Sequence, residues 1–143
     1  VEKEKGIRLH EYKGAGAAGG MGGALIAFLG GEFRQGIHLV LEVMKYKEKI
    51  QGADYVFTGE GKSDRQTLHG KAPFGVLQCA KEYEIPTVLL SGCIDEEDKQ
   101  LLAQYYYAIY SVAGESISTE QAMNEASSCL TQRAFEAFTK IVK

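Results

Sequence analysis

A short apolar run that opens into a polar loop is the feature that most constrains the fold of this chain. Residues 55–57 form the run, within a strand expected over residues 55–58, and the loop extends from there to Pro73. Gly59 and Gly61 lie at the start of the loop, and because glycine has no β-carbon they let the backbone bend sharply and approach a ligand. Open α/β sheets bind their ligands where a strand ends in such a loop. The stretch therefore predicts an α/β fold with a ligand site in this loop.

The rest of the chain repeats an alternation of strand and helix patterns. The continuous apolar run at residues 87–91 is typical of a parallel strand covered on both faces, and we expect a third strand at residues 106–112. Helices are expected at residues 34–46, from near Pro73 to a point before Pro86, in a short segment after Asp95, and over residues 119–143. This order is typical of a right-handed parallel sheet. We therefore predict one three-layer α/β/α domain over residues 1–143, with a small, mainly parallel sheet.

Length, composition and charge exclude several functional classes. With 143 residues, 45% apolar and 24% charged, the chain has the size and composition of one soluble globular domain. A net charge of -3 favours neither nucleic acid nor an anionic membrane as a partner. The three cysteines are widely spaced and suit reduced, buried thiols of a cytoplasmic protein. A sheet of three or four strands is thin, so we expect a partner domain or a second copy of the chain to cover an edge.

A second unusual stretch, residues 14–23, is rich in glycine and leads into an apolar segment. Each glycine inside a helix is less favourable than alanine by roughly 1 kcal/mol, so the presence of many glycines here needs a physical explanation. Either its N–H groups form a cradle for a phosphate or carboxylate at a helix start, or another backbone packs very closely against it. The run has dinucleotide-loop spacing, but no clear strand precedes it and no acidic residue is placed for a ribose. The ending of a P-loop is missing.

The polar loop carries the candidate catalytic residues Glu60, Asp64 and Lys71. The two carboxylates could act as a general base or hold a divalent cation between phosphate oxygens, although carboxylates in turns are usually solvated or capping groups. Lys71 could supply a point charge for a phosphate. Asp95, after the second strand, could contact a ligand, but an N-cap for the following helix is the simpler interpretation. The residues assigned to cofactor binding are Gly14, Gly16, Gly19, Gly20, Gly59, Gly61, Gln66 and Thr67; those assigned to a metal are Asp64 and Glu60.

Taken together, these motifs resemble a known family. The glycine run at residues 14–22 with the apolar segment that follows it, the Thr-Gly-Glu-Gly motif at residues 58–61, and the Asp-Arg-Gln-Thr-Leu-His-Gly-Lys-Ala-Pro motif at residues 64–73 look like the C-terminal part of class I bacterial glycerate kinases. The similarity extends over essentially the whole chain and is strongest from Gly14 to Pro73.

The resemblance implies a kinase that uses ATP and Mg²⁺ to phosphorylate D-glycerate at its 2-hydroxyl. Such kinases have two α/β domains with the active site in the cleft between them. The N-terminal motifs of the family are absent here, and the chain begins at Val1, so we expect it to be a C-terminal fragment that provides one wall of the cleft and is inactive without the N-terminal part. The competing hypothesis is a non-catalytic, Rossmann-like module that binds a ligand or a protein.

Overall fold

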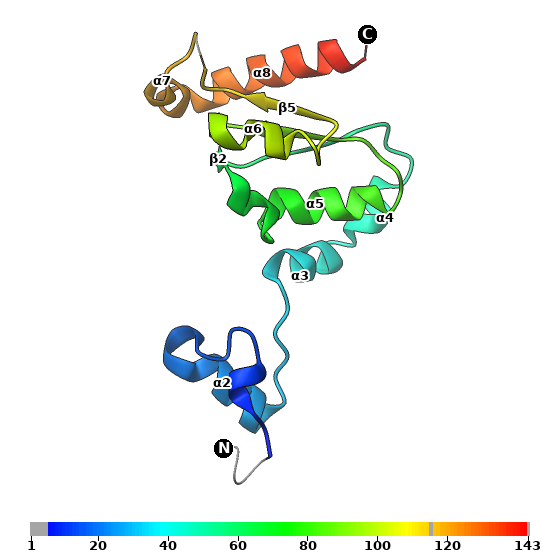
Figure 1. Ribbon diagram of the computed structural model, residues 1–143. Helices are drawn as coiled ribbons and strands as arrows, with labels where there is room; N and C mark the ends of the chain where they lie inside the picture. Colours follow the sequence, from blue (N-terminus) through cyan, green and yellow to red (C-terminus); the bar gives the residue numbers. More distant parts are fainter. Residues whose placement is uncertain (1–5, 115, 143) are drawn as a thin grey trace. The chain divides into compact units, whose positions relative to one another are not determined.

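The structure is a computed structural model that describes residues 6–114 and 116–142 (Figure 1). The chain divides into two compact units, Val1–Gly36 and Ile37–Lys143. The first contains a short 3-10 helix, η1 (Leu9–Glu11), and helix α2 (Ala17–Leu29). The second contains the remaining helices and both sheets.

The second unit is built on a parallel sheet of three strands in the order β1-β3-β5. They are β1 (Val56–Thr58), β3 (Thr87–Ser91) and β5 (Ala108–Ser111). Each lies inside a run that the sequence predicts as a strand, so the parallel α/β prediction is confirmed; β1 and β5 are shorter than expected. A second parallel pair, β2 (Lys62–Ser63) with β4 (Cys93–Ile94), extends the arrangement beyond the carboxyl ends of β1 and β3.

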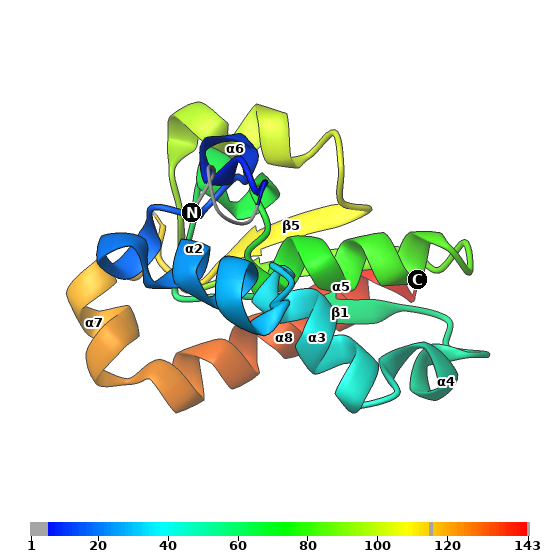
Figure 2. The same ribbon diagram turned by 90° about the horizontal axis from the view of Figure 1, so that it is seen from below.

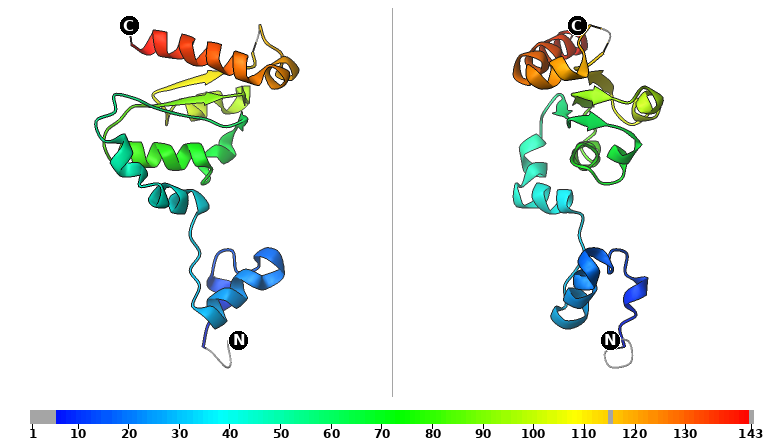
Figure 3. Two further views of the ribbon diagram at one scale, coloured as in Figure 1. Left: turned by 180° about the vertical axis from the view of Figure 1, so that it is seen from behind. Right: turned by 90° about the vertical axis from the view of Figure 1, so that its left-hand side faces the viewer.

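Helices cover both faces of this sheet, which gives the three layers (Figures 1 and 3). Helices α5 (Ala72–Lys81) and α6 (Glu96–Leu102) lie on one face, and α7 (Thr119–Asn124) and α8 (Ala126–Ile141) lie on the other. Helix α3 (Gly36–Val43) packs against α5, since Ile37 contacts Gly75. Helix α4 (Tyr46–Ile50) packs near the C-terminal end of α5 (Figure 2).

Three clusters of apolar side chains form the core of the second unit, and two of them lie on opposite faces of the sheet. The cluster under α5 and α6 consists of Leu77, Leu89, Ile94, Leu102 and Tyr106. The cluster on the opposite face consists of Val112, Ala122 and Cys129. Leu89 and Leu102 are fully buried, and complete burial of a leucine contributes roughly 1.5–3 kcal/mol. All three cysteines are free thiols, but only Cys129 is buried as expected, whereas Cys79 and Cys93 are partly exposed.

Two of the predicted helices are interrupted. Residues 34–46 do not form one helix: α3 ends at Val43, and Lys45 adopts a left-handed φ of 51° before α4 begins. The expected helix over residues 119–143 is divided at Glu125, whose φ of -114° lies outside the helical range. Asn124 precedes this break, and asparagine favours helix ends because its side chain competes for backbone hydrogen bonds. The expected helix starting near Pro73 and the one after Asp95 are both confirmed, as α5 and α6.

Gly59 should be essential to the fold because the loop after β1 presses against the end of β3. A β-carbon on Gly59 would overlap the carbonyl oxygen of Leu90, a backbone atom that cannot move aside. We expect Gly59→Ala to destabilise the protein by about 3 kcal/mol, as overpacking of a rigid site does, measured by unfolding in denaturant. Gly61→Ala is the control, since a β-carbon there meets no atom within 4 Å, and should change stability by at most about 0.5 kcal/mol. If both variants lost the same small amount of stability, the loop would be able to move away from β3.

Candidate functional site

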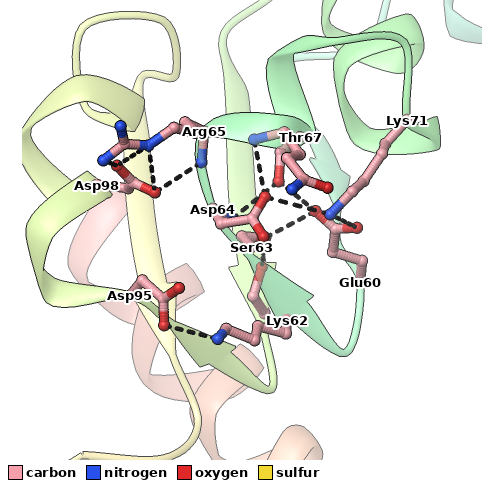
Figure 4. Close-up of polar contacts among 11 residues, drawn as sticks. Glu60, Lys62, Ser63, Asp64, Arg65, Thr67, Lys71, Asp95 and Asp98 are labelled. Atoms are coloured by element: carbon pink, nitrogen blue, oxygen red, sulfur yellow. Dashed lines mark hydrogen bonds and ion pairs between the residues drawn. The ribbon is translucent and has the colours of Figure 1, made fainter.

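The polar loop after β1 folds around its own hydrogen bonds (Figure 4). Asp64 is the N-cap of a 3-10 helix, η2 (Arg65–Leu68), and its Oδ1 accepts a bond from the Gln66 N–H at 2.8 Å. In return, Thr67 Oγ1 accepts a bond from the Asp64 N–H at 3.1 Å. This reciprocal pair is a capping box, which satisfies N–H groups that a helix start leaves without partners. The local sequence therefore fixes where the Asp64 carboxylate points.

The Glu60 carboxylate is held by hydroxyl groups. Its Oε1 accepts hydrogen bonds from Thr67 Oγ1 and, at 3.1 Å, from Ser63 Oγ. Ser63 lies on β2 and also shares a 2.6 Å bond with Ser91 Oγ at the end of β3. Ser63, Thr67 and Ser91 are completely buried, so these hydroxyls have fixed partners. Hydroxyl groups from β2 and η2 therefore hold the Glu60 carboxylate directly, and β3 supports it through the bond between Ser91 and Ser63.

Lys71 brings the two carboxylates together. Its Nζ lies 3.4 Å from Asp64 Oδ1 and 3.5 Å from Glu60 Oε2 (Figure 4). Lys71 is also the N-cap residue of α5, which fixes its backbone at the mouth of the site. The cluster of Glu60, Asp64 and Lys71, called here the carboxylate–lysine cluster, therefore unites all three residues that the sequence suggests as catalytic. One ammonium between two carboxylates leaves the cluster with a net negative charge.

The electrostatic surroundings keep Asp64 ionised. Partial burial alone would raise its pKa, but the hydrogen bond from the Gln66 N–H and the contact with Lys71 outweigh that effect and lower the pKa below its ordinary value. A carboxylate with a lowered pKa is a weaker base. It is therefore better suited to holding a cation than to accepting a proton.

A buried carboxylate that sequence reasoning missed anchors the loop from α6. Asp98 accepts bonds from the Arg65 backbone N–H at 2.8 Å and from Arg65 Nε at 3.0 Å. Arg65 Nη2 lies 2.9 Å from the same carboxylate, whose side chain is only 8% exposed. The hydrogen bonds from the Arg65 side chain and backbone lower the pKa of Asp98. Nothing in the sequence pairs residues that are 33 positions apart.

Asp95 occupies the predicted N-cap position of α6, but it does not cap the helix with its side chain. Instead its Oδ1 forms an ion pair with Lys62 Nζ at 3.0 Å. This pair joins the β2 and β4 ends of the loop (Figure 4). Both side chains are substantially exposed, so the pair contributes little stability.

The proposed cofactor-binding residues fall into two groups. Gly59, Gly61, Gln66 and Thr67 lie in the same loop as the carboxylate–lysine cluster, whereas Gly14, Gly16, Gly19 and Gly20 lie in the N-terminal unit. Gln66 is exposed beside the cluster. Thr67 is different, because its buried hydroxyl is already bonded to Glu60.

The glycine run has two distinct parts. Gly22 and Gly23 lie in close packing, because β-carbons there would collide with the Phe33 ring and approach the Ala15 carbonyl oxygen to 3.1 Å. Gly19 and Gly20 instead have left-handed φ values of 67° and 92°, and a β-carbon on either would meet no atom within 4 Å. Close packing therefore explains why the end of the run is glycine. The left-handed backbone conformation explains the glycines in its middle.

The residues that the structure describes contain neither a preformed metal cage nor a membrane span. Among residues 6–114 and 116–142, no group of three or more His, Cys, Asp or Glu side chains could hold a metal ion. In the described part of the chain, no helix is both long and apolar enough to cross a bilayer.

The family model and three curated relatives that match this chain all point to one family. The model of the glycerate kinase family matches residues 1–142. The chain is 35% identical to the glycerate kinase of Bacillus subtilis over 145 aligned positions, covering 100% of this chain and 38% of the relative. It is 37% identical to the glycerate kinase of Halalkalibacterium halodurans, covering 94% of this chain and 35% of the relative. The glycerate 2-kinase of Escherichia coli is 41% identical over 68% of this chain and 26% of the relative.

A solved structure agrees in fold as well as sequence. A crystal structure from Salmonella typhimurium LT2, of a protein assigned as glycerate kinase 2, superposes with a TM-score of 0.69 at 36% identity. It covers 98% of this chain and 36% of the other. The chain spans about a third of the length of the longer relatives it matches.

The Asp98–Arg65 pair should make stability depend on pH. Because the pKa of Asp98 is lowered in the folded state, its stabilisation is fully present above about pH 5 and is lost as the pH falls through the folded-state pKa. We expect Asp98→Asn to lower the melting temperature at pH 7, and the difference from the unmodified protein to shrink below about pH 4. Glu97→Gln, an exposed neighbour on α6, is the control. A constant difference across the pH range would contradict the pair's role.

Proposed function

The chain belongs to the glycerate kinase family, and from this we propose that the enzyme it forms transfers the γ-phosphoryl group of ATP to the 2-hydroxyl of D-glycerate. This chain would supply one wall of the active-site cleft, with the carboxylate–lysine cluster as its chemical centre. The observation that carries the proposal is the convergence of Glu60, Asp64 and Lys71 at the end of β1, within a hydrogen-bonded and partly buried loop. Parallel α/β sheets bind ligands at this edge.

Phosphoryl transfer needs positioned charge more than it needs covalent chemistry. In the proposed reaction the bond from the γ-phosphorus to the bridging oxygen of ADP breaks, and a bond forms between that phosphorus and the 2-oxygen of glycerate. The hydroxyl proton leaves to a carboxylate or to water. Lys71 would lie against the phosphate oxygens and offset the charge that develops there.

The two carboxylates fit a magnesium ion shared with a nucleotide. Mg²⁺ usually takes one or two protein carboxylates and completes its shell with phosphate oxygens and water, and the cluster carries a net negative charge. When bound, the ion would neutralise charge on the transferred phosphoryl group. We assign Asp64 as its main ligand because its lowered pKa keeps it ionised. Glu60, bonded through both oxygens, would chiefly position Lys71.

We also propose that the enzyme works in the cytoplasm. ATP is available there, and the free thiols of Cys79, Cys93 and Cys129 suit a reducing compartment. The exposed edges of a three-stranded sheet suit contact with a further domain or with a second copy of the chain.

The direct test of this function is a product assay. The complete enzyme, incubated with D-glycerate, ATP and Mg²⁺, should release ADP and form 2-phosphoglycerate, distinguishable from 3-phosphoglycerate by phosphorus NMR. Omitting Mg²⁺ or adding a chelator should abolish the reaction. Formation of the 3-phosphate would overturn the assignment of the 2-hydroxyl, and no phosphorylated product at all would overturn the function.

The same assay, applied to the 143-residue chain alone, tests whether it forms only one wall. We expect little or no ADP release from this chain by itself. Normal turnover by the isolated chain would show that its site is complete.

Replacing Lys71 tests the cluster without removing either carboxylate. Lys71→Met should lower kcat by about 100-fold, the usual cost of losing one charged donor to a developing oxyanion. Lys62→Met is the matched control, because Lys62 lies in the same loop but pairs with Asp95 outside the cluster. Its kcat should remain close to that of the unmodified enzyme. Equal losses in the two variants would indicate a general effect on the loop rather than a role in transfer.

A further inference from the structure

An open groove lies at the carboxyl ends of the strands, on the face of the sheet covered by α7 and α8. Its volume is about 490 Å³. The sheet and the loops after it contribute Phe57, Thr58, Gly59, Glu60, Gly61, Leu90, Gly92 and Val112, and the two helices contribute Ala122, Ala126 and Leu130. All of these residues belong to the second unit.

Most of the side chains that line the groove are apolar, and three of the lining residues are glycines. Phe57 and Leu90 come from neighbouring strands, and Leu130 comes from α8. Of these glycines, Gly92 lies so close to Gly61 that a β-carbon would come within 2.6 Å of the Gly61 carbonyl oxygen. Apolar side chains, together with backbone that no side chain covers at the glycines, suit a planar heteroaromatic ring.

The size and polarity of the groove do not suit glycerate. Pockets for drug-sized ligands measure about 300–1,000 Å³ and are lined mainly by apolar side chains, and this groove lies in that range. A three-carbon hydroxy acid is far smaller and has a polar group on every carbon. Burying it against Phe57, Leu90 and Leu130 would leave its hydroxyls and carboxylate without partners, which is costly.

Glu60 is the residue that the groove and the carboxylate–lysine cluster share. Glu60 lines the groove, and its carboxylate lies 3.5 Å from Lys71 Nζ. A ligand bound in the groove with one end at Glu60 would therefore have an apolar surface along its length and a positive charge beyond that end. ATP has this order of groups, with a flat base at one end and phosphates at the other.

We propose that this groove is the nucleoside subsite, holding the adenine and ribose of ATP while the phosphates extend past Glu60 to Lys71. The proposal rests on the function proposed above and assigns this chain to the nucleotide side of the cleft. D-glycerate would then be bound chiefly by the opposite wall.

Adenosine is the probe that separates the groove from the charged cluster, because it has a base and a ribose but no phosphate. In the complete enzyme, calorimetry should detect adenosine binding. Ala126→Phe, which fills the groove from an exposed helix position, should weaken adenosine and ATP binding by about tenfold or more, as steric misfit in an apolar pocket does. Lys71→Met should weaken ATP binding while leaving adenosine binding unchanged.

Two further variants keep the test decisive. Ser127→Phe adds the same bulk at the next, exposed position of α8, which does not line the groove, and it should bind adenosine normally. Leu130→Gln removes apolar wall without filling space and should also weaken adenosine binding. Circular dichroism of each variant checks that α8 remains folded.

The outcomes distinguish this proposal from the proposed function. Normal glycerate phosphorylation, with adenosine binding that is absent or unaffected by Ala126→Phe and Leu130→Gln, would overturn the subsite and leave the function standing. An increased KM for D-glycerate with an unchanged KM for ATP in Ala126→Phe would also overturn it. Adenosine binding that is lost in both groove variants, in an enzyme that phosphorylates no glycerate, would support the subsite and overturn the function.

Discussion

The close approach of the loop after β1 to the end of β3 is the contact on which the site depends. A backbone can come this near only without side chains, which explains glycine at positions 59 and 92. The contact is locked by hydrogen bonds from the Gly92 N–H to the Glu60 carbonyl at 3.0 Å and from the Cys93 N–H to the Gly61 carbonyl at 2.9 Å. These bonds lead directly into the β2–β4 pair, which places Ser63 against Ser91. The orientation of Glu60 follows from that placement.

This packing turns flexible groups into fixed ones. Glutamate and lysine side chains lose up to about 2 kcal/mol of conformational entropy when they are ordered, so the cluster needs partners that favour one arrangement. The buried hydroxyls of Ser63 and Thr67 provide them for Glu60, and the capping box provides them for Asp64. Asp98 ties η2 to α6 through Arg65. In the proposed reaction, ligand binding would use a site whose geometry already exists, which is the main source of electrostatic catalysis.

Sequence patterns identified the strands and the polar loop after β1 because both have strong local signals. The apolar run that became β3 has the expected boundaries, and Pro73 marks the start of α5. The β2–β4 pair was not foreseen, since two-residue strands have no periodicity to detect. The helix breaks at Lys45 and Glu125 depend on backbone angles that apolar spacing does not encode. The Asp98–Arg65 pair depends on tertiary structure, and so does the groove, whose lining residues come from five separate segments of the chain.

The exposure of the cluster supports the idea that a second wall completes the site. Lys71 remains 34% exposed, so water screens its attraction for a phosphate: two unit charges 4 Å apart interact by about 1 kcal/mol in water and by about 4 kcal/mol at an effective dielectric constant of 20. A rate enhancement typical of kinases requires the stronger interaction, and closing the cleft would provide it by excluding water. Binding of a base in the proposed nucleoside subsite would depend less on closure, because the free energy of burying a base depends on the apolar contact area. In the proposed function, a nucleotide would therefore bind to this wall first, and its positioned phosphates would become reactive when the opposite wall closes over them.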